Sequence, residues 1–329
     1  MTITPDPTWS LFVQLRSGPG AALVYDRAIA VAVEAERLGF GTIWFATRHF
    51  EAHHAALPSV FPFLGAAAAR TTRIRLGTGV VALPFENPVR LAEDAVVTDQ
   101  LAGGRLELGI GKGLGFGLSA SSYTGFTLDQ NDRERLYTER AAALHTILET
   151  GRVSEEIGLY PPPGDLRRRV WQSTGNIETA RLAARAGDGL LPHGNSEARG
   201  GAGLRDLIDA YRSEYAGEGG PRIGSTVAVL PGDSHRDALG LFTTDVSLSP
   251  RYYTGSLDDG DHHRYLADRG ILAGSSDDVV TELSADARVR SATEVLFHVP
   301  LALEHPRYLE CLQRISDEIA PRLVPVAAS

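Results

Sequence analysis

One stretch of the chain, residues 71–117, constrains the fold more than any other. It reads TTRIRLGTGVVALPFENPVRLAEDAVVTDQLAGGRLELGIGKGLGFG. An apolar run over residues 74–81 precedes Asn87-Pro88, where proline suits the first turn of a helix because its missing N–H donor would be unpaired there anyway. A second apolar run follows at residues 106–110. Two strands joined by a helix in this way predict a parallel βαβ unit with loops at the same strand ends.

The rest of the chain repeats this alternation of strand and helix. The expected strands cover residues 10–15, 42–46, 74–81, 106–110, 169–173, 189–191, 224–230 and 294–298. The expected helices cover residues 23–38, 60–70, 87–101, 131–149, 177–186, 204–215, 275–283 and 308–319. No linker rich in Pro, Gly or Ser divides them. The pattern favours one α/β domain over residues 1–329, a single (β/α)8 TIM barrel, rather than two doubly wound domains.

Three long connections are expected as insertions, chiefly at the C-terminal mouth of the strands, where barrel active sites lie. Residues 111–130 form a glycine-rich, aromatic loop. The prolines at 161–163 exclude regular structure, so residues 151–168 are expected to be an extended excursion. Residues 243–269 have weak periodicity and are interpreted as either a substrate lid or an oligomer contact. The mouth itself is expected to hold residues 47–54, 78–83, 111–117 and 173–179.

Charge and apolar content exclude several classes of partner. The net charge of −9 and pI near 5.6 disfavour binding to nucleic acid or to an anionic membrane surface. No apolar run approaches the roughly 18 residues of a membrane span, and a cytoplasmic location is expected by default. The single cysteine, Cys311, lies in a helical pattern and is predicted to be a buried thiol.

Glycines alternate along residues 109–117, yet neither common nucleotide fingerprint is present. No placement gives G-x-G-x-x-G, and Lys112 lacks the flanking residues of a phosphate-binding P-loop. Two interpretations remain. The loop either lets a flat ligand approach the backbone closely beside Lys112, or it is a flexible lid.

Ser173-Thr174-Gly175-Asn176 directly precedes a predicted helix and is a candidate anion site. Free backbone N–H groups and the helix dipole favour an anion such as phosphate at this position, and Thr179 adds a hydroxyl in the first turn. The alternative is that these polar side chains only cap the helix.

Three histidines, His49, His53 and His54, follow the second expected strand. Spacing of i and i+4 permits a metal site on a helix, but the H-E-x-x-H pattern is absent and the intervening residues show no helical face. A histidine directly after a barrel strand fits acid–base chemistry or ligand hydrogen bonding better, so no metal is expected.

Several separated segments, in the same order, resemble the luciferase-like flavin-dependent monooxygenases. They are ERLGFGTIWFATRHF (36–50), the stretch 71–117, NIETARLAARAGDGLLP (176–192), ILAGSSDDVVTEL and EVLFHVPL. The resemblance implies a (β/α)8 barrel that binds reduced FMN, or in a sister branch a deazaflavin, in the mouth. It also implies a homodimer formed through the second and third helices.

The resemblance assigns candidate cofactor-binding residues. Thr78, Gly79 and Val80 would form a bulge behind the isoalloxazine ring, with a non-proline cis peptide at Gly79-Val80. Lys112 and Arg133 match cations near the flavin phosphate. The phosphate-binding helix start would comprise Ser173, Gly175, Asn176 and Thr179, which agrees with the anion site above.

One departure from the family pattern concerns the catalytic residues. Bacterial luciferases carry E-H-H-F where this chain has Thr47-Arg48-His49-Phe50. Arg48 replaces the luciferase base and cannot accept a proton near neutral pH. Aldehyde oxidation with light emission is therefore not expected. His49 is the candidate to position or protonate a peroxide, and Arg48 to bind an anionic substrate group. Gly111 stands where luciferases place a cysteine.

The leading hypothesis is a monooxygenase that receives reduced FMN from a separate flavin reductase, because the sequence contains no second nucleotide-binding domain. Dioxygen would form a flavin hydroperoxide that oxygenates a small organic substrate. The alternatives are a deazaflavin-dependent hydride-transfer oxidoreductase, a non-catalytic flavin-binding subunit and, more distantly, a metal-dependent barrel hydrolase.

Overall fold

The computed structural model describes residues 8–16, 20–50, 57–113, 120–193, 202–248, 262–302 and 306–323. The strands are β1 (Thr8–Val13), β2 (Thr42–Phe45), β3 (Arg75–Thr78), β4 (Val81–Ala82), β5 (Leu106–Gly111), β6 (Val170–Thr174), β7 (Gly189–Pro192), β8 (Gly224–Pro231), β9 (Ile271–Gly274) and β10 (Glu294–His298). The α-helices are α1 (Ala21–Arg37), α2 (Val60–Ala68), α3 (Pro88–Leu101), α4 (Ala120–Gly125), α5 (Arg133–Thr150), α6 (Ile177–Arg185), α7 (Leu204–Glu214), α8 (His235–Leu248), α9 (His262–Asp268), α10 (Ser276–Ala285), α11 (Ala287–Ser291) and α12 (Arg307–Arg314).

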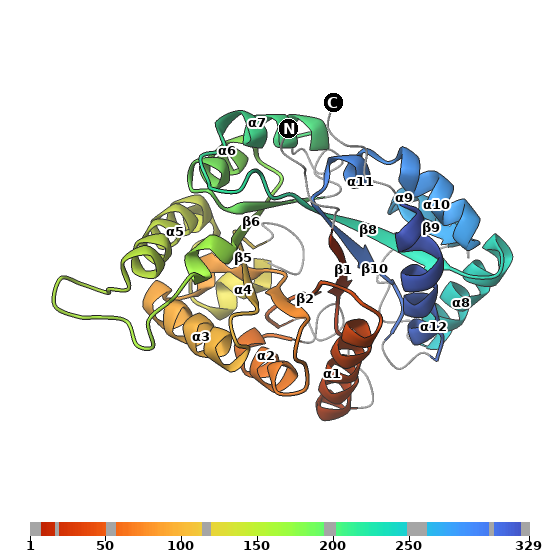
Figure 1. The fold of residues 1–329 in the computed structure, drawn as a ribbon, viewed down its shortest axis with the longest axis horizontal. Coiled ribbons are helices and arrows are strands. Elements are labelled where there is room, and N and C mark those ends of the chain that lie inside the picture. Colours follow the sequence, from red (N-terminus) through yellow and green to blue (C-terminus); the bar gives the residue numbers. More distant parts are fainter. Residues whose placement is uncertain are drawn as a thin grey trace.

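The strands form one parallel sheet that curves into a ring. Its order is β7-β6-β5-β3-β2-β1-β10-β8-β9, and β4 also pairs with β5. A parallel bridge between Leu190 and Ile223 joins β7 to the residue before β8. Figure 1 shows the helices arranged around the outside of this ring. Because parallel strands need crossover connections, the helices cover the outer face of the sheet.

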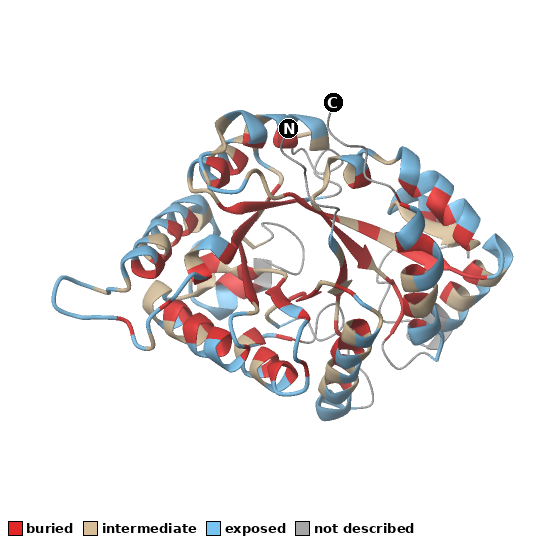
Figure 2. Ribbon diagram, in the orientation of Figure 1, coloured by how far each residue is buried: buried red, intermediate tan, exposed pale blue. Residues whose placement is uncertain are grey.

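Burial follows this arrangement. Figure 2 shows buried residues along the strands and on the helix faces turned toward the sheet. Inside the ring, the indoles of Trp44 and Trp171 meet edge to face with their centroids 5.5 Å apart. Gly77 and Gly189 make room for them, since a Cβ at either position would lie 2.2–2.3 Å from an indole atom. Glycine opposite tryptophan therefore fills the interior without voids.

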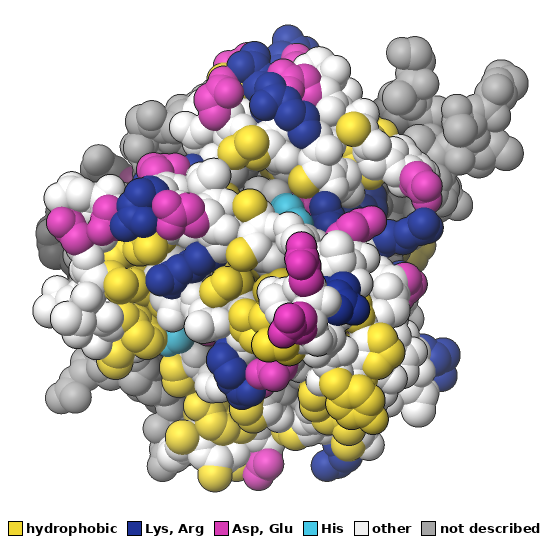
Figure 3. All heavy atoms as spheres, turned by 90° about the vertical axis from the view of Figure 1, so that its left-hand side faces the viewer, with side chains coloured by type: hydrophobic (Ala, Val, Ile, Leu, Met, Phe, Trp, Pro, Cys, Tyr) yellow, Lys and Arg dark blue, Asp and Glu magenta, His cyan; other side chains and the backbone are white. Residues whose placement is uncertain are grey.

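The outer surface is charged. Figure 3 views the molecule from the side that carries α3 and α5, and acidic and basic side chains lie beside each other across it. Pairs such as Arg90–Glu93 on α3 and Arg135–Glu139 on α5 account for this pattern. Among the described residues, no helix is both long and apolar enough to cross a membrane.

Most expected elements are confirmed to within about two residues, and the prediction for β10 matches residue for residue. The expected third strand is wrong as one element, because residues 79 and 80 separate β3 from β4. The described parts of residues 243–269, which were expected to have weak periodicity, belong largely to α8 and α9, and their interpretation as a substrate lid or an oligomer contact stays a prediction. Residues 249–261 lie outside the described part of the chain.

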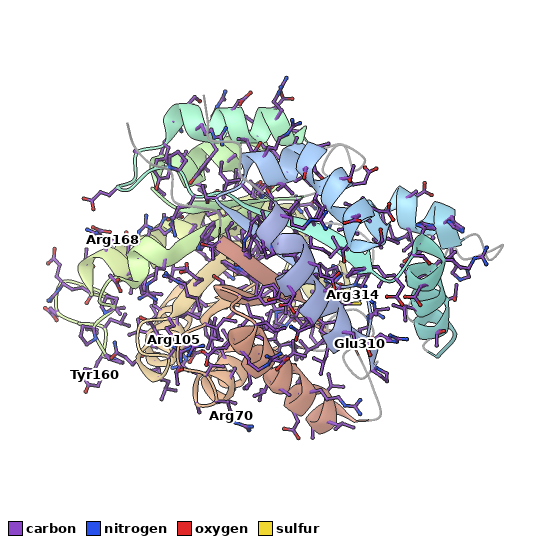
Figure 4. The ribbon with its side chains drawn as sticks, turned by 45° about the vertical axis from the view of Figure 1, so that its right-hand side comes forward. Arg70, Arg105, Tyr160, Arg168, Glu310 and Arg314 are labelled. Carbon is purple, nitrogen blue, oxygen red and sulfur yellow. The ribbon has the colours of Figure 1, made fainter. Side chains whose placement is uncertain are left out.

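The excursion before β6 is confirmed as largely irregular. An antiparallel bridge between Arg152 and Gly158 holds it together. Tyr160 is 86% exposed and, as Figure 4 shows, lies at the outer edge of the molecule. Cys311 is buried and unpaired as predicted, and burial raises the pKa of its thiol to about 12.

Candidate active site

The strand register brings the candidate residues to one end of the ring. Phe45 pairs with Thr78, and Gly111 pairs with Ser173. Because these strands are all parallel, the residues that follow them lie on the same side, which we call the mouth. Lys112 and Thr174 therefore lie at the same level on neighbouring strands. Of the expected mouth segments, the described residues 47–50, 78–83, 111–113 and 173–179 follow or end strands at this side of the sheet.

A bulge between β3 and β4 lies at the mouth, and its Gly79-Val80 peptide bond is cis, where the family resemblance located it. Hydrogen bonds fix both sides of the bulge. The Gly79 N–H donates to the Phe45 carbonyl oxygen at 2.8 Å, and the Thr78 hydroxyl donates to the Gly109 carbonyl oxygen at 2.7 Å. The Thr47 hydroxyl donates to the carbonyl oxygen of Val80.

Glycines are required opposite the bulge. A Cβ at Gly109 would lie 2.1 Å from the Thr78 carbonyl oxygen, and one at Gly111 would lie 2.8 Å from the Val80 side chain. The alternating glycines of β5 therefore serve close backbone packing within the sheet. Residues 114–119, which contain the rest of the glycine-rich loop, lie outside the described chain.

Two cations, Lys112 just after β5 and Arg133 at the start of α5, share one carboxylate. Lys112, only 14% exposed, pairs with the Glu134 carboxylate, which also accepts from Arg133 at 3.1 Å. Partial burial would raise the pKa of Glu134, but the hydrogen bond and charge of Lys112, together with Arg133, outweigh it and lower that pKa. We call Lys112, Arg133 and Glu134 the cation group. It brings together two predicted site residues and carries a net charge of one.

Helix α5, which carries Arg133, is fixed by a buried polar chain. The Tyr137 hydroxyl donates to Gln172 Oε1 at 2.7 Å, and Gln172 Nε2 donates to Asp188 Oδ2 at 2.7 Å. Arg167 pairs with the same carboxylate at 2.5 Å. The Lys112 ammonium lies 5.4 Å from the centroid of the Tyr137 ring. This chain positions the cation group relative to β5 and β6.

The start of α6 is capped as the simpler interpretation of its sequence predicted. Asn176 Oδ1 accepts from the backbone N–H of Thr179 at 3.1 Å, and the Thr174 hydroxyl accepts from the Asn176 N–H at 2.9 Å. Thr179 is 2% exposed. An N-cap satisfies one of the first free N–H groups of a helix. The cap uses the N–H of Thr179, so an anion at this helix start would need other donors.

We expect Asn176→Ala to lower the free energy of unfolding by about 1 kcal/mol, because the cap at α6 is lost. Asn87, which caps α3 by accepting from Val89 and Arg90, is the matched control and should give a similar loss. Urea unfolding measures both. Only Asn176→Ala should also weaken reduced-FMN binding, and equal FMN affinity in the two variants would argue against a ligand role for the α6 start.

His49 is surrounded by aromatic rings. Its centroid lies 4.8 Å from that of Phe126 and 5.6 Å from that of Phe85, at interplanar angles of 90° and 85°. Burial lowers the pKa of His49, so its imidazole is neutral at pH 7. The backbone N–H of Arg48 donates to the Leu57 carbonyl oxygen at 3.4 Å. His53 and His54 lie outside the described residues, and the described residues contain no group of three metal-binding side chains.

Sequence reasoning missed His298, at the mouth end of β10. Glu294 accepts from the Trp44 indole inside the ring, and alternation along β10 turns His298 to the same face. Its Nδ1 lies 3.1 Å from the Phe12 carbonyl oxygen. Because a carbonyl oxygen can only accept, Nδ1 is the donor, and Nε2 of the neutral ring is the acceptor. The Phe12 ring in turn lies 2.9 Å from the Cβ position of Gly79.

Burial lowers the pKa of His298 to about 4, so the unfolded chain binds the proton more tightly. Stability is expected to fall as the pH drops from about 6.5 toward 4, by on the order of 2 kcal/mol. His298→Gln removes the titrating imidazole, so the loss of stability between about pH 6.5 and about pH 4 should be smaller by that free energy. Urea unfolding at several pH values in this window measures it, and identical pH dependence in both proteins would contradict the assignment.

Comparison with known proteins identifies the class. The profile of the luciferase-like monooxygenase family matches residues 8–289. The chain therefore belongs to this family, and its predicted family membership is confirmed. It spans only 54–57% of the length of several curated relatives that it matches.

Particular relatives include the 4-hydroxyprotoasukamycin monooxygenase of Streptomyces nodosus subsp. asukaensis. It is 36% identical over 135 residues, which cover 41% of this chain and 34% of that protein. The oxygenating constituent of 3,6-diketocamphane monooxygenase from Pseudomonas putida, solved with FMN, has a TM-score of 0.73 at 19% identity, covering 98% of this chain and 100% of that one.

A coenzyme F420 dependent tetrahydromethanopterin reductase from Methanopyrus kandleri has a TM-score of 0.66 at 13% identity, covering 97% of this chain and 99% of that one. At such identities the solved structures establish the fold alone. The chain is thus a parallel α/β protein with the fold of luciferase-like barrel enzymes, and monooxygenases among its relatives support an oxidoreductase.

Proposed function

We propose that the protein is a flavin-dependent monooxygenase that uses reduced FMN and dioxygen to oxygenate a small organic substrate. In this proposal the chain forms one domain, a (β/α)8 TIM barrel with insertions at the mouth. The observation that carries the proposal is the register of β5 and β6. Because Gly111 pairs with Ser173, Lys112 lies at the level of Thr174 and Gly175, and all three are close to the glycine-lined bulge. Family membership supports the reaction class.

The residues at the mouth fit the two halves of FMN. The cation group has a net positive charge and lies at the level of the α6 start, where free N–H groups favour a phosphate. The FMN phosphate would be held by Lys112, Arg133, Ser173, Gly175, Asn176 and Thr179. Thr78, Gly79 and Val80 would back the isoalloxazine ring. Positions 79 and 111 carry no side chain, and a Cβ there would lie 2.9 Å from the Phe12 ring and 2.8 Å from the Val80 side chain.

Bound reduced FMN would supply the activation of dioxygen. The chain's own residues would exclude water and manage protons. The aromatic rings around His49 form an apolar wall, and exclusion of water strengthens electrostatic contacts at such a site. Neutral His49 offers one donor and one acceptor to a reacting oxygen or substrate. Arg48, permanently cationic, would bind an anionic substrate group.

We propose two protein partners. A separate flavin reductase would supply reduced FMN. This is supported by the diketocamphane structure, which is the oxygenating constituent of its monooxygenase. A second copy of the chain would pack against α2 and α3. Exposed apolar side chains on α3 support the homodimer, since Leu101 is 64% and Val97 is 45% exposed.

The second candidate function is deazaflavin-dependent hydride transfer, favoured by the structural likeness to an F420-dependent reductase. Anaerobic titration of the protein with reduced FMN and, separately, with reduced deazaflavin tests the choice. We expect tighter binding of reduced FMN. Preference for deazaflavin would reject the monooxygenase in favour of hydride transfer. Binding of reduced FMN without any oxygenated product from a substrate panel would instead indicate a non-catalytic flavin-binding subunit.

A further inference from the structure

Five aromatic rings, which we call the aromatic cluster, meet at one side of the mouth. They belong to His49, Phe50, Phe85, Tyr123 and Phe126, and come from the residues after β2, the 3-10 turn at Leu83–Phe85 and the region of α4. Phe85 and Phe126 stack at 5.1 Å with an interplanar angle of 17°. Phe85 also contacts Tyr123 at 4.8 Å, and Phe126 contacts Phe50 at 5.6 Å between centroids.

The cluster is not simply a core that fixes α4. Tyr123 is 2% exposed, as expected of a packing residue, but Phe126 is 38% and Phe50 is 65% exposed. Leaving large apolar rings in water forfeits the free energy that their burial would give. Exposed aromatic surface beside a polar site is typical of a ligand contact. Both of these rings therefore keep exposed surface that a ligand could cover.

Phe50 is held in an uncommon way. Its backbone has a φ of 61°, in the left-handed region that non-glycine residues rarely adopt. Its ring packs on the Gly125 backbone so closely that a Cβ there would lie 2.4 Å from a ring carbon. The backbone on both sides is thus arranged to keep this exposed ring in place, as is common at ligand sites.

The cluster borders the bulge. Thr47, two residues before His49, donates its hydroxyl to the Val80 carbonyl oxygen. The Tyr123 hydroxyl donates to the Lys112 carbonyl oxygen at 3.1 Å, and the Phe85 ring lies 3.5 Å from the Cβ position of Gly113. A ligand on the exposed rings would consequently lie next to the proposed flavin position.

We propose that Phe50 and Phe126, with His49 between the same rings, bind the substrate of the proposed oxygenation, and that this substrate is a planar aromatic compound carrying a hydroxyl group. The inference rests on the proposed function. Aromatic rings gain about 0.5–1.5 kcal/mol from stacking beyond the burial of area, which saturated rings do not. The His49 imidazole can accept a hydrogen bond from the substrate hydroxyl. The aromatic rings around His49 offer the imidazole only weak hydrogen-bond partners.

Three probes separate the two parts of this site. 2-Naphthol has both the aromatic ring and the hydroxyl, 2-methoxynaphthalene lacks the O–H donor, and 2-decalol lacks the aromatic ring. Calorimetric titration of the full-length protein is expected to give the tightest binding for 2-naphthol, about three- to tenfold tighter than 2-decalol. Equal affinities for these two probes, or no binding of 2-naphthol, would overturn the proposal.

Substitutions test the residues. Phe126→Leu and Phe50→Leu keep apolar area but remove the ring, so each should weaken 2-naphthol about threefold or more and leave 2-decalol unchanged. His49→Leu should weaken 2-naphthol but not 2-methoxynaphthalene. Leu309→Ala, at a side chain 47% exposed on α12, is the control and should change nothing.

The result that would overturn the residue assignment is wild-type affinity for 2-naphthol in both phenylalanine variants. The melting temperature of each variant shows whether it is folded. If one phenylalanine variant misfolds, the other still tests the assignment, because the two substitutions are at separate positions. Reduced-FMN affinity is measured in parallel. If the wild type binds reduced FMN but not 2-naphthol, only this substrate site is contradicted, whereas failure of the wild type to bind reduced FMN contradicts the proposed function.

Discussion

Gly109→Ala is expected to lower the free energy of unfolding by at least about 3 kcal/mol and to abolish flavin binding. Gly109 lies in the middle of β5, between β3 and β6. A Cβ there would lie 2.1 Å from the Thr78 carbonyl oxygen, 3.0 Å from the Val80 side chain and 3.2 Å from the Trp44 ring. A carbonyl oxygen of the neighbouring strand cannot rotate away, so β3 must move and the bulge moves with it.

Urea unfolding measures this loss, with Gly65→Ala as the matched control. Gly65 lies inside α2, and its added Cβ would lie 3.6 Å from Leu101 Cδ1, an ordinary contact. Alanine is favoured over glycine in a helix by about 1 kcal/mol, so the same substitution should stabilise the protein there. A Gly109→Ala protein as stable as the wild type would show that β5 and the bulge are not packed as described.

The double variant Lys112→Met/Arg133→Met is expected to weaken reduced-FMN binding about 100-fold. A hydrogen bond between a charged donor and a phosphate contributes about 1.5–3 kcal/mol. Each of these side chains is partly exposed, 14% for Lys112 and 29% for Arg133, which limits each to roughly tenfold. Anaerobic fluorescence titration measures the affinities.

Riboflavin, which lacks the phosphate, is the control ligand and should bind both proteins within about threefold of each other. Glu134→Gln supplies a change of opposite sign, because Glu134 pairs with both cations and would no longer compete with the phosphate. Arg90→Met, which removes an exposed cation on α3 paired with Glu93, should have no effect. Equal losses of FMN and riboflavin affinity would mean that the cation group supports the fold rather than the phosphate.

The sequence predicts the strands well for a physical reason. Parallel strands covered on both faces are continuous apolar runs bounded by turn residues, and the residues of β2, β5 and β7 are all buried. Helix α8 was missed because its composition is weak. It contains Gly240, Thr243 and Thr244, which favour helix poorly, and among the side chains described in it only Ala238 and Phe242 are fully buried.

The sequence likewise predicted some residues of the candidate site and missed others. Residues contiguous with a strand end, such as Thr78, Lys112 and Asn176, could be placed at the mouth from the sequence because the parallel alternation fixes which end they share. The sequence contained a usable signal for His298. Glu294, Leu296 and His298 alternate along β10 and so point to the same inner face, but sequence reasoning did not use this alternation. The aromatic cluster gave none, since its rings come from three segments that only the tertiary fold brings together.

The proposed function requires the protein to bind reduced FMN and to direct its reaction with dioxygen. The most direct test mixes the protein, loaded anaerobically with reduced FMN, with oxygenated buffer in a stopped-flow spectrophotometer. We predict that the bound flavin reoxidises more slowly than free flavin, through a transient hydroperoxide absorbance, and that 2-naphthol accelerates the decay of this absorbance. Reoxidation with the single-phase kinetics of free flavin, without a transient, would contradict the account.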